Sequence, residues 1–126
     1  MLTLDKTTRT PIYEQIIEGL QREILLGILK PLDQLPSIRE VAVMLSANPN
    51  TVQKSYILLE ERGIIQMQHG KGCFVSENAY QILNNRLRTK LSDIKALTNE
   101  LALAGIPKEE IISVVESSYK NATEKK

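Results

Sequence analysis

Residues 35–75 read LPSIREVAVMLSANPNTVQKSYILLEERGIIQMQHGKGCFV. Two short helical patterns follow one another in this stretch and meet at Asn48-Pro49, and two β-type runs then flank the sequence His-Gly-Lys-Gly. Two helices joined by a tight turn and followed by a β-hairpin are typical of a winged helix-turn-helix. Such a unit can place a helix with short polar side chains in a DNA major groove.

The first helix of the pair has a clear start and a clear end. Ser37 and Glu40 have the spacing of a capping box, in which each side chain binds the other residue's free backbone N–H. The helix must end before Pro49, because the residue before a proline is pushed out of the helical region. Its predicted apolar face consists of Val41, Ala42 and Leu45.

The second helix starts at Pro49, with Asn48 as its N-cap, and ends near Gly63. Helical spacing predicts that Val52, Tyr56 and Leu59 face the core. The open side of the first turns then carries Asn50, Thr51, Gln53 and Lys54.

The two β-type runs predict a hairpin, the wing. Ile65 and Met67 alternate with glutamines, residues 69–72 form the tip, and residues 73–75 return as a strand. We interpret Cys73 as a small buried hydrophobe and His69 as an exposed tip residue. No second His accompanies His69, so we expect neither a metal site nor a cofactor.

Helical patterns also flank this unit. On the N-terminal side a helix is expected from Pro11 to Leu26, followed by a turn over residues 28–35. On the C-terminal side, one apolar stripe begins at Tyr80 and runs to Leu101, and residues 104–107 end that helix and start another. The second stripe consists of Ile111, Ile112, Val115 and Tyr119.

These patterns predict a mainly α fold with a small β-hairpin, in two parts. Residues 1–76 form the winged helix-turn-helix and residues 77–126 form a helical tail. Two amphipathic helices cannot enclose a core of their own. We therefore expect a homodimer in which residues 80–119 of two protomers bury their stripes against each other.

Composition sets further limits. The 126 residues carry 16 Lys and Arg against 15 Asp and Glu, and the net charge of +1 is a weak electrostatic signature for a protein that binds phosphates. A dimer could still gather its cations on one face, namely Lys6, Arg9, Arg39, Lys54 and Lys71. No apolar segment approaches the roughly 20 residues that cross a bilayer. A lone cysteine and the absence of a signal-peptide pattern favour the cytoplasm.

Five motifs in order resemble the GntR family of bacterial transcriptional regulators, over residues 9–76. They are PIYEQI at 11–16, LPSIRE at 35–40, NPNTV at 48–52, LEERGI at 59–64 and GKG at 70–72. The NPNTV run and the short two-helix tail resemble the YtrA-type branch. This resemblance implies a dimeric repressor, often encoded beside ABC-transporter genes, that lacks the large effector-binding domain of other branches.

The resemblance also implies residue roles. Arg39 would hold a phosphate or a base, and the exposed residues Asn50, Thr51, Gln53 and Lys54 would face the groove. His69, Gly70 and Lys71 would bring the wing to the minor groove or backbone, and Arg9 joins this expected DNA-binding set. Two features differ from many relatives. The helix that starts at Pro49, which would be the recognition helix, has no Arg at its groove-facing positions. Cys73 stands where relatives usually carry Thr or Ser.

Two other functional classes are alternatives to a sequence-specific regulator. An enzyme needs a convergent acid, base or nucleophile set, which one His, one Cys and scattered carboxylates do not supply. A winged-helix module that binds another protein would suit the neutral charge, and a gel shift on upstream DNA distinguishes it. We predict a repressor of a transport operon that binds a two-fold symmetric operator as a homodimer, with no small-molecule effector identified.

Overall fold

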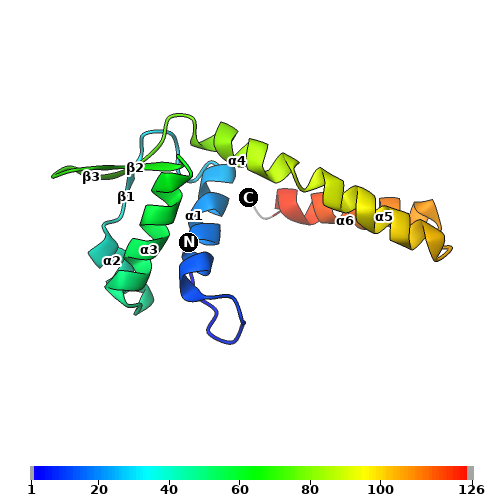
Figure 1. The fold of residues 1–126 in the computed structure, drawn as a ribbon, viewed down its shortest axis with the longest axis horizontal. Coiled ribbons are helices and arrows are strands. Elements are labelled where there is room, and N and C mark those ends of the chain that lie inside the picture. The colour runs from blue at the N-terminus through cyan, green and yellow to red at the C-terminus, as the bar shows by residue number, and fades with distance from the viewer. Residues whose placement is uncertain (1, 125–126) are drawn as a thin grey trace. The chain divides into compact units, whose positions relative to one another are not determined.

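The computed structural model describes residues 2–124 and forms two compact units, one ending at Asn84 and the other beginning at Asn85. The described residues form six helices and three strands (Figure 1). In chain order these are α1 (Ile12–Leu25), β1 (Gln34–Leu35), α2 (Ile38–Leu45), α3 (Pro49–Glu61), β2 (Ile65–Gln68), β3 (Gly72–Val75), α4 (Ala79–Arg88), α5 (Leu91–Leu103) and α6 (Lys108–Glu124). The predicted winged helix-turn-helix and mainly α class are confirmed.

Helix α3 lies at the centre of the first unit, with α1 and α2 packed against it (Figure 1). The three residues predicted from its spacing to face the core, Val52, Tyr56 and Leu59, are all buried. They pack with the apolar face of α1 and with the residues that follow α3, a cluster that includes Ile16, Ile17, Leu20, Ile24, Val41, Ile64, Ile65 and Val75. Because one side of α3 packs in this core, the opposite side is exposed to solvent.

The helix ends follow the local chemistry of the sequence. Ser37 Oγ accepts from the Glu40 N–H at 3.0 Å, and Glu40 Oε1 accepts from the Ser37 N–H at 3.0 Å, so the capping box is present. Asn48 Oδ1 accepts from the Asn50 N–H at 2.8 Å, with Pro49 as the first residue of α3. Helix α1 begins one residue later than predicted, because Pro11 adopts an extended conformation and serves as the N-cap.

The hairpin has a third strand that the sequence did not reveal. The sheet order is β1-β3-β2, and both pairings are antiparallel. Gln34 pairs with Phe74 and Leu35 with Cys73, so the end of the expected turn over residues 28–35 is a strand. Two residues are too few to show an alternating pattern, and the pairing partner lies far along the chain.

The predicted continuous helix after residue 80 is wrong, since it is two helices. Thr89 and Lys90 separate α4 from α5, and their N–H groups bond three residues back, to Arg86 and Leu87. The Thr89 hydroxyl also donates to the Arg86 carbonyl oxygen at 2.7 Å. This side-chain bond competes with the normal helical pattern and tightens the turn.

The start of α4 belongs to the core of the first unit. Ala79 is fully buried and Leu83 is 2% exposed, in the same cluster as the residues of α1 and α3. The predicted apolar stripe from Tyr80 to Leu101 includes Leu83, and for this residue the prediction is wrong because Leu83 packs in the core of the first unit. The first unit therefore continues eight residues past the predicted boundary at residue 76, to Asn84.

The second unit exposes much of its apolar surface. Helix α5 has no buried residue. In the single chain, the large exposed apolar side chains of α5 and α6 are Leu91, Ile94, Leu97, Leu103, Ile112, Val114, Val115 and Tyr119. They include most of the two predicted stripes.

Candidate nucleic-acid interface

The first two turns of α3 present polar side chains to solvent. Asn50, Gln53 and Lys54 are exposed, whereas Thr51 is half-buried. The Thr51 carbonyl oxygen lies 3.2 Å from the hydroxyl of the buried Ser55. Amide groups such as those of Asn50 and Gln53 can both donate and accept, which suits them to the edges of bases.

Lys54 has a different environment from its exposed neighbours. Its Nζ lies 3.9 Å from the centre of the Tyr13 ring, near the start of α1. The side chain is therefore directed towards α1. Spacing along the sequence does not predict this contact, because the rest of α1, β1 and the whole of α2 lie between Tyr13 and Lys54.

The angle between α2 and α3 is fixed by the turn and by one buried hydroxyl. Ser46 has a left-handed conformation with φ of 51°, and the Ala47 N–H donates to the Ala42 carbonyl oxygen at 3.0 Å. Tyr56 donates from its hydroxyl to the Pro36 carbonyl oxygen at 2.6 Å. Burial raises the pKa of the Tyr56 hydroxyl, which therefore stays protonated as a donor. The helical spacing predicts that Tyr56 lies in the core, but it does not reveal this bond.

Arg39 lies at the second residue of α2 and is exposed. It borders a shallow hollow that is also lined by Ser37, Glu40, Val43 and Met44. The capping bonds from Ser37 hold the pKa of Glu40 below its usual range, so a carboxylate stays beside Arg39. Because Ser37 and Glu40 already cap this helix start, a phosphate contact here depends on the exposed Arg39 side chain.

The wing tip carries the three predicted residues in one tight turn. His69, Gly70 and Lys71 are exposed between β2 and β3, and Gly70 has φ of 77°. Two side chains outside the tip hold the hairpin. Gln34 Nε2 donates to the Lys71 carbonyl oxygen at 3.3 Å, and Glu60 Oε2 accepts from the Met67 N–H at 2.9 Å.

Arg9 lies in the segment that precedes α1, and this segment is folded back on the helix. Gln15 holds it with both ends of its amide. Its Nε2 donates to the carbonyl oxygens of Asp5 at 2.8 Å and Thr10 at 3.0 Å, and its Oε1 accepts from the Asp5 N–H at 2.7 Å. Arg9 is thus presented from an ordered loop near the start of α1.

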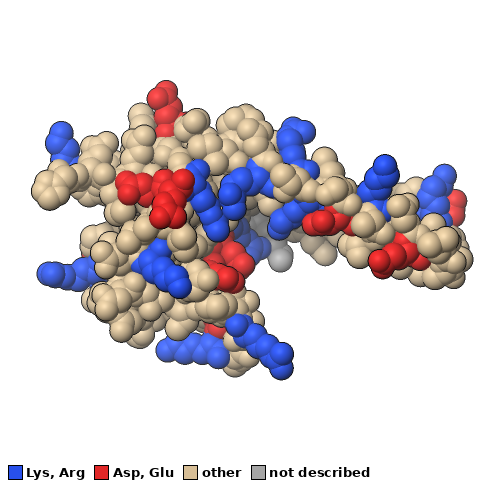
Figure 2. Space-filling model, in the orientation of Figure 1, with Lys and Arg blue, Asp and Glu red and all other residues tan. Residues whose placement is uncertain are grey.

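The predicted DNA-binding residues thus lie on four pieces of chain: α3, the start of α2, the hairpin turn and the N-terminal segment. Figure 2 shows Lys and Arg side chains spread over the visible face with acidic groups between them. On this face the cations do not merge into one patch.

Two other features are close to the interface but offer no reactive group. Cys73 is buried in β3, and burial and the nearby Glu60 carboxylate raise the pKa of its thiol to about 11. The thiol is therefore protonated and unreactive near neutral pH. Among residues 2–124, no group of three or more His, Cys, Asp or Glu side chains is placed to hold a metal ion.

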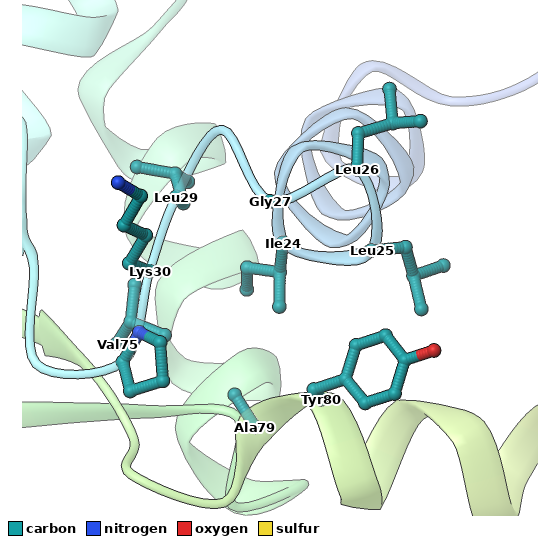
Figure 3. Close-up of a pocket in the computed structure, with 10 residues that line it drawn as sticks. Ile24, Leu25, Leu26, Gly27, Leu29, Lys30, Val75, Ala79 and Tyr80 are labelled. Atoms are coloured by element: carbon teal, nitrogen blue, oxygen red, sulfur yellow. The ribbon is translucent and has the colours of Figure 1, made fainter. Parts of the chain in front are cut away.

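A pocket of about 310 Å³ lies within the first unit. Figure 3 shows Ile24 and Leu25 of α1 pointing towards Ala79 and Tyr80 of α4. Nine of the ten residues that line the pocket are uncharged, and Lys30 is the exception. None of the predicted DNA-contacting residues lines it.

Within the described residues, no helix is long and apolar enough to cross a membrane.

Comparison with known proteins identifies relatives along most of the chain. Residues 12–75 match the family model described as bacterial regulatory proteins, gntR family. The HTH-type transcriptional repressor YtrA of Bacillus subtilis is 43% identical over 112 residues, which cover 88% of this chain and 86% of YtrA.

Solved structures agree with this match. A GntR family transcriptional regulator from Listeria monocytogenes has a TM-score of 0.73 and 34% identity, and the match covers 90% of this chain and 98% of that one. YtrA from Sulfolobus acidocaldarius, a GntR-family transcription factor, has a TM-score of 0.62 and 38% identity, with 75% and 97% covered.

Proposed function

The chain belongs to the GntR family of bacterial regulatory proteins, and from this premise we propose that it represses a transport operon by binding a two-fold symmetric operator as a homodimer. Its relatives are transcriptional regulators and not enzymes, and the chain itself is a transcriptional regulator with a DNA-binding fold. The operator symmetry, the dimer and the target genes are the parts that we propose.

One observation carries the proposal: Asn50 and Gln53 lie exposed on the first turns of α3 while the opposite side of the helix is buried. This is the arrangement in which a recognition helix enters the major groove with the residues of its N-terminal half against base edges. In this proposal Arg39, Lys71 and Arg9 contact phosphates, and His69 and Gly70 bring the wing tip to the backbone or minor groove. Thr51 is half-buried, so in this proposal it lies at the edge of the surface of α3 that contacts DNA.

The exposed apolar side chains of the second unit support the homodimer. Leu91, Ile94 and Leu97 of α5 and Val115 and Tyr119 of α6 are all more than a third exposed in the single chain. Several large apolar side chains exposed on the same two helices are typical of an interface. A symmetric pair would bury these side chains and present two recognition helices to two half-sites about one DNA turn apart, roughly 34 Å.

The resemblance to the YtrA-type branch implies the transport operon, and YtrA of Bacillus subtilis is itself a transcriptional repressor. Footprinting on the DNA upstream of the gene tests the proposal directly. We expect a protected region with two inverted half-sites, beside or within a transport operon. A protein that shifts no upstream DNA would instead fit the alternative of a module that binds another protein.

Substitution of Gln53 tests base recognition. Gln53→Ala should cost roughly 1 to 3 kcal/mol of binding free energy on the operator, because a bidentate amide contact to one base is lost. The preference of the protein for one base over the others should weaken at one operator position only. Competition with operators mutated at each position measures this, and an equal loss of affinity on random DNA would contradict a role in base recognition.

A further inference from the structure

We infer that Tyr13 is a positioning residue for DNA binding: its ring holds the Lys54 ammonium beside α1, so that Lys54 contacts a phosphate and not a base edge. The inference rests on the proposed function, and it assigns different targets to neighbouring residues of the same helix. Gln53 contacts a base edge, whereas Lys54 contacts a phosphate of the DNA backbone and so helps to position α3.

The contact itself is specific. Lys54 Nζ lies 3.9 Å from the centre of the Tyr13 ring, well inside the range of about 6 Å over which a cation is attracted to an aromatic face. A lysine side chain is flexible and strongly hydrated, and on an open helix face it would sample many directions. The ring selects one of them, towards the start of α1.

Two hydrogen bonds hold Tyr13, one at its carbonyl oxygen and one at its hydroxyl, and its side chain packs partly buried against the core. The hydroxyl of the buried Ser55 donates to the Tyr13 carbonyl oxygen at 3.0 Å, and this bond ties α1 to α3 one residue beyond Lys54. The Tyr13 hydroxyl donates to Glu14 Oε1 at 3.2 Å. This bond to a carboxylate raises the pKa of Tyr13, so the ring remains neutral.

The held ammonium suits a phosphate. An ammonium is a compact point charge, and it binds phosphate without the planar two-point geometry that base recognition requires. A cation–π contact uses no specific N–H donor, so the exposed Lys54 ammonium can still donate to a phosphate. The N-terminal segment that Gln15 folds back on α1 carries Lys6 and Arg9, both exposed, at the same end of the helix. Phosphate contacts there would fix the register of α3 in the groove.

The experiment is a double-mutant cycle with a conservative control. Tyr13→Leu removes the aromatic face but keeps an apolar side chain, Tyr13→Phe keeps the face, and Lys54→Met removes the charge but keeps the stem. Binding of the full-length chain to its operator and to a random-sequence duplex is measured between about 50 and 200 mM salt. Thermal unfolding of each variant verifies that it is folded.

We expect Lys54→Met to lower the salt slope by about one on both duplexes, without a change in base preference. Tyr13→Leu should weaken binding about 2- to 5-fold when Lys54 is present and should have no effect in the Lys54→Met background. Tyr13→Phe keeps the aromatic face but loses the hydroxyl bond to Glu14, so it should retain most of the binding that Tyr13→Leu loses. A role confined to packing would give the same loss in both backgrounds.

Two results would overturn the inference. One is an equal effect of Tyr13→Leu with and without Lys54. The other is a change of base preference at one operator position in Lys54→Met with an unchanged salt slope. If the wild type binds no operator, the proposed function fails, but the cycle on the random duplex still decides the role of Tyr13, because a phosphate contact needs no particular sequence.

Discussion

Gly72 is the residue at which the wing tolerates a side chain least. Its φ is +113°, beyond the left-handed region that Asn or Asp can adopt, and an added Cβ would lie 2.7 Å from Gln34 Nε2. Gln34 could move aside, but it would then lose its bond to the Lys71 carbonyl oxygen. Gly70 has a φ of +77° and open space around it, so its conformation is strained for other residues without being crowded.

We therefore predict that Gly72→Ala lowers the free energy of unfolding by about 1 to 3 kcal/mol, mainly through backbone strain. Gly70→Asn is the matched control, and it should cost well under that amount because Asn tolerates a left-handed conformation. Denaturant unfolding of the two variants measures the difference. Equal costs at the two positions would show that φ at residue 72 is not the controlling factor.

The buried Cys73 gives stability a dependence on alkaline pH. Burial raises the pKa of its thiol to about 11 from the ordinary value of 9.0. The folded state therefore holds the proton more tightly than the unfolded state. The stabilisation is fully present below pH 9, falls as the pH rises, and is lost once the pH passes about 11.

The prediction is that the wild type loses on the order of 1 kcal/mol more stability than Cys73→Ala when the pH rises from 7 to about 10. The control variant is needed because tyrosines and lysines also titrate in this range. Urea unfolding of both proteins at the two pH values provides the comparison. Parallel losses in the two proteins would mean that the thiol does not titrate in the folded state as described.

At the scale of elements, the helix ends of the first unit were predictable because each depends on neighbouring residues. Ser37 and Glu40 cap each other, and Asn48 and Pro49 start α3. Gly63, with φ of +79°, ends it. These signals act over a few residues, so the sequence alone contains them.

The elements that were missed depend on distant partners or on competing bonds. β1 has only two residues and exists because β3 pairs with it. The break between α4 and α5 follows from a Thr89 hydroxyl bond that the apolar spacing does not reveal.

Of the candidate site, the exposed residues of α3 were predictable from spacing. The contact of Lys54 with the Tyr13 ring was not predictable, because it depends on the pairing of Tyr13 with Ser55, and these two residues lie 42 positions apart in the sequence.

The start of α2 and the wing supply cations on two separate elements, and both should act on phosphates. Arg39→Ala or Lys71→Ala should weaken specific and non-specific binding alike and lower the salt slope by about one for each lost contact. Lys95→Ala, an exposed cation on α5, is the control and should leave the slope unchanged. Titrations over a range of salt concentrations give the slopes, and unchanged slopes for both test variants would exclude these contacts.

At the scale of the whole molecule, the division of the chain determines how the dimer should be tested. A truncation after Ser76 would remove Ala79 and Leu83, which are buried in the first unit, and would damage the core it was meant to isolate. A point substitution in the second unit avoids this problem. Leu97 is suitable because it lies in the middle of α5 and is 58% exposed in the single chain.

Leu97→Glu should convert the dimer to a monomer. In a monomer the new carboxylate would stay in water and cost little, and Glu is a good helix former. In a dimer that buries this face, the carboxylate would be desolvated without a partner, which strongly opposes association. Without the second half-site held nearby, operator affinity should fall by roughly 10² or more, while α3 and the wing stay folded.

Ile28→Glu is the matched control for this change. Ile28 is a similarly sized side chain, 57% exposed, in the first unit. Its substitution introduces the same charge outside the proposed interface and should leave both the dimer and the affinity intact. Sedimentation velocity at micromolar concentration decides between the outcomes. If Leu97→Glu still sediments as a dimer, or if the wild type is already a monomer, the exposed face of α5 does not form the interface, and the two-fold operator loses its structural basis.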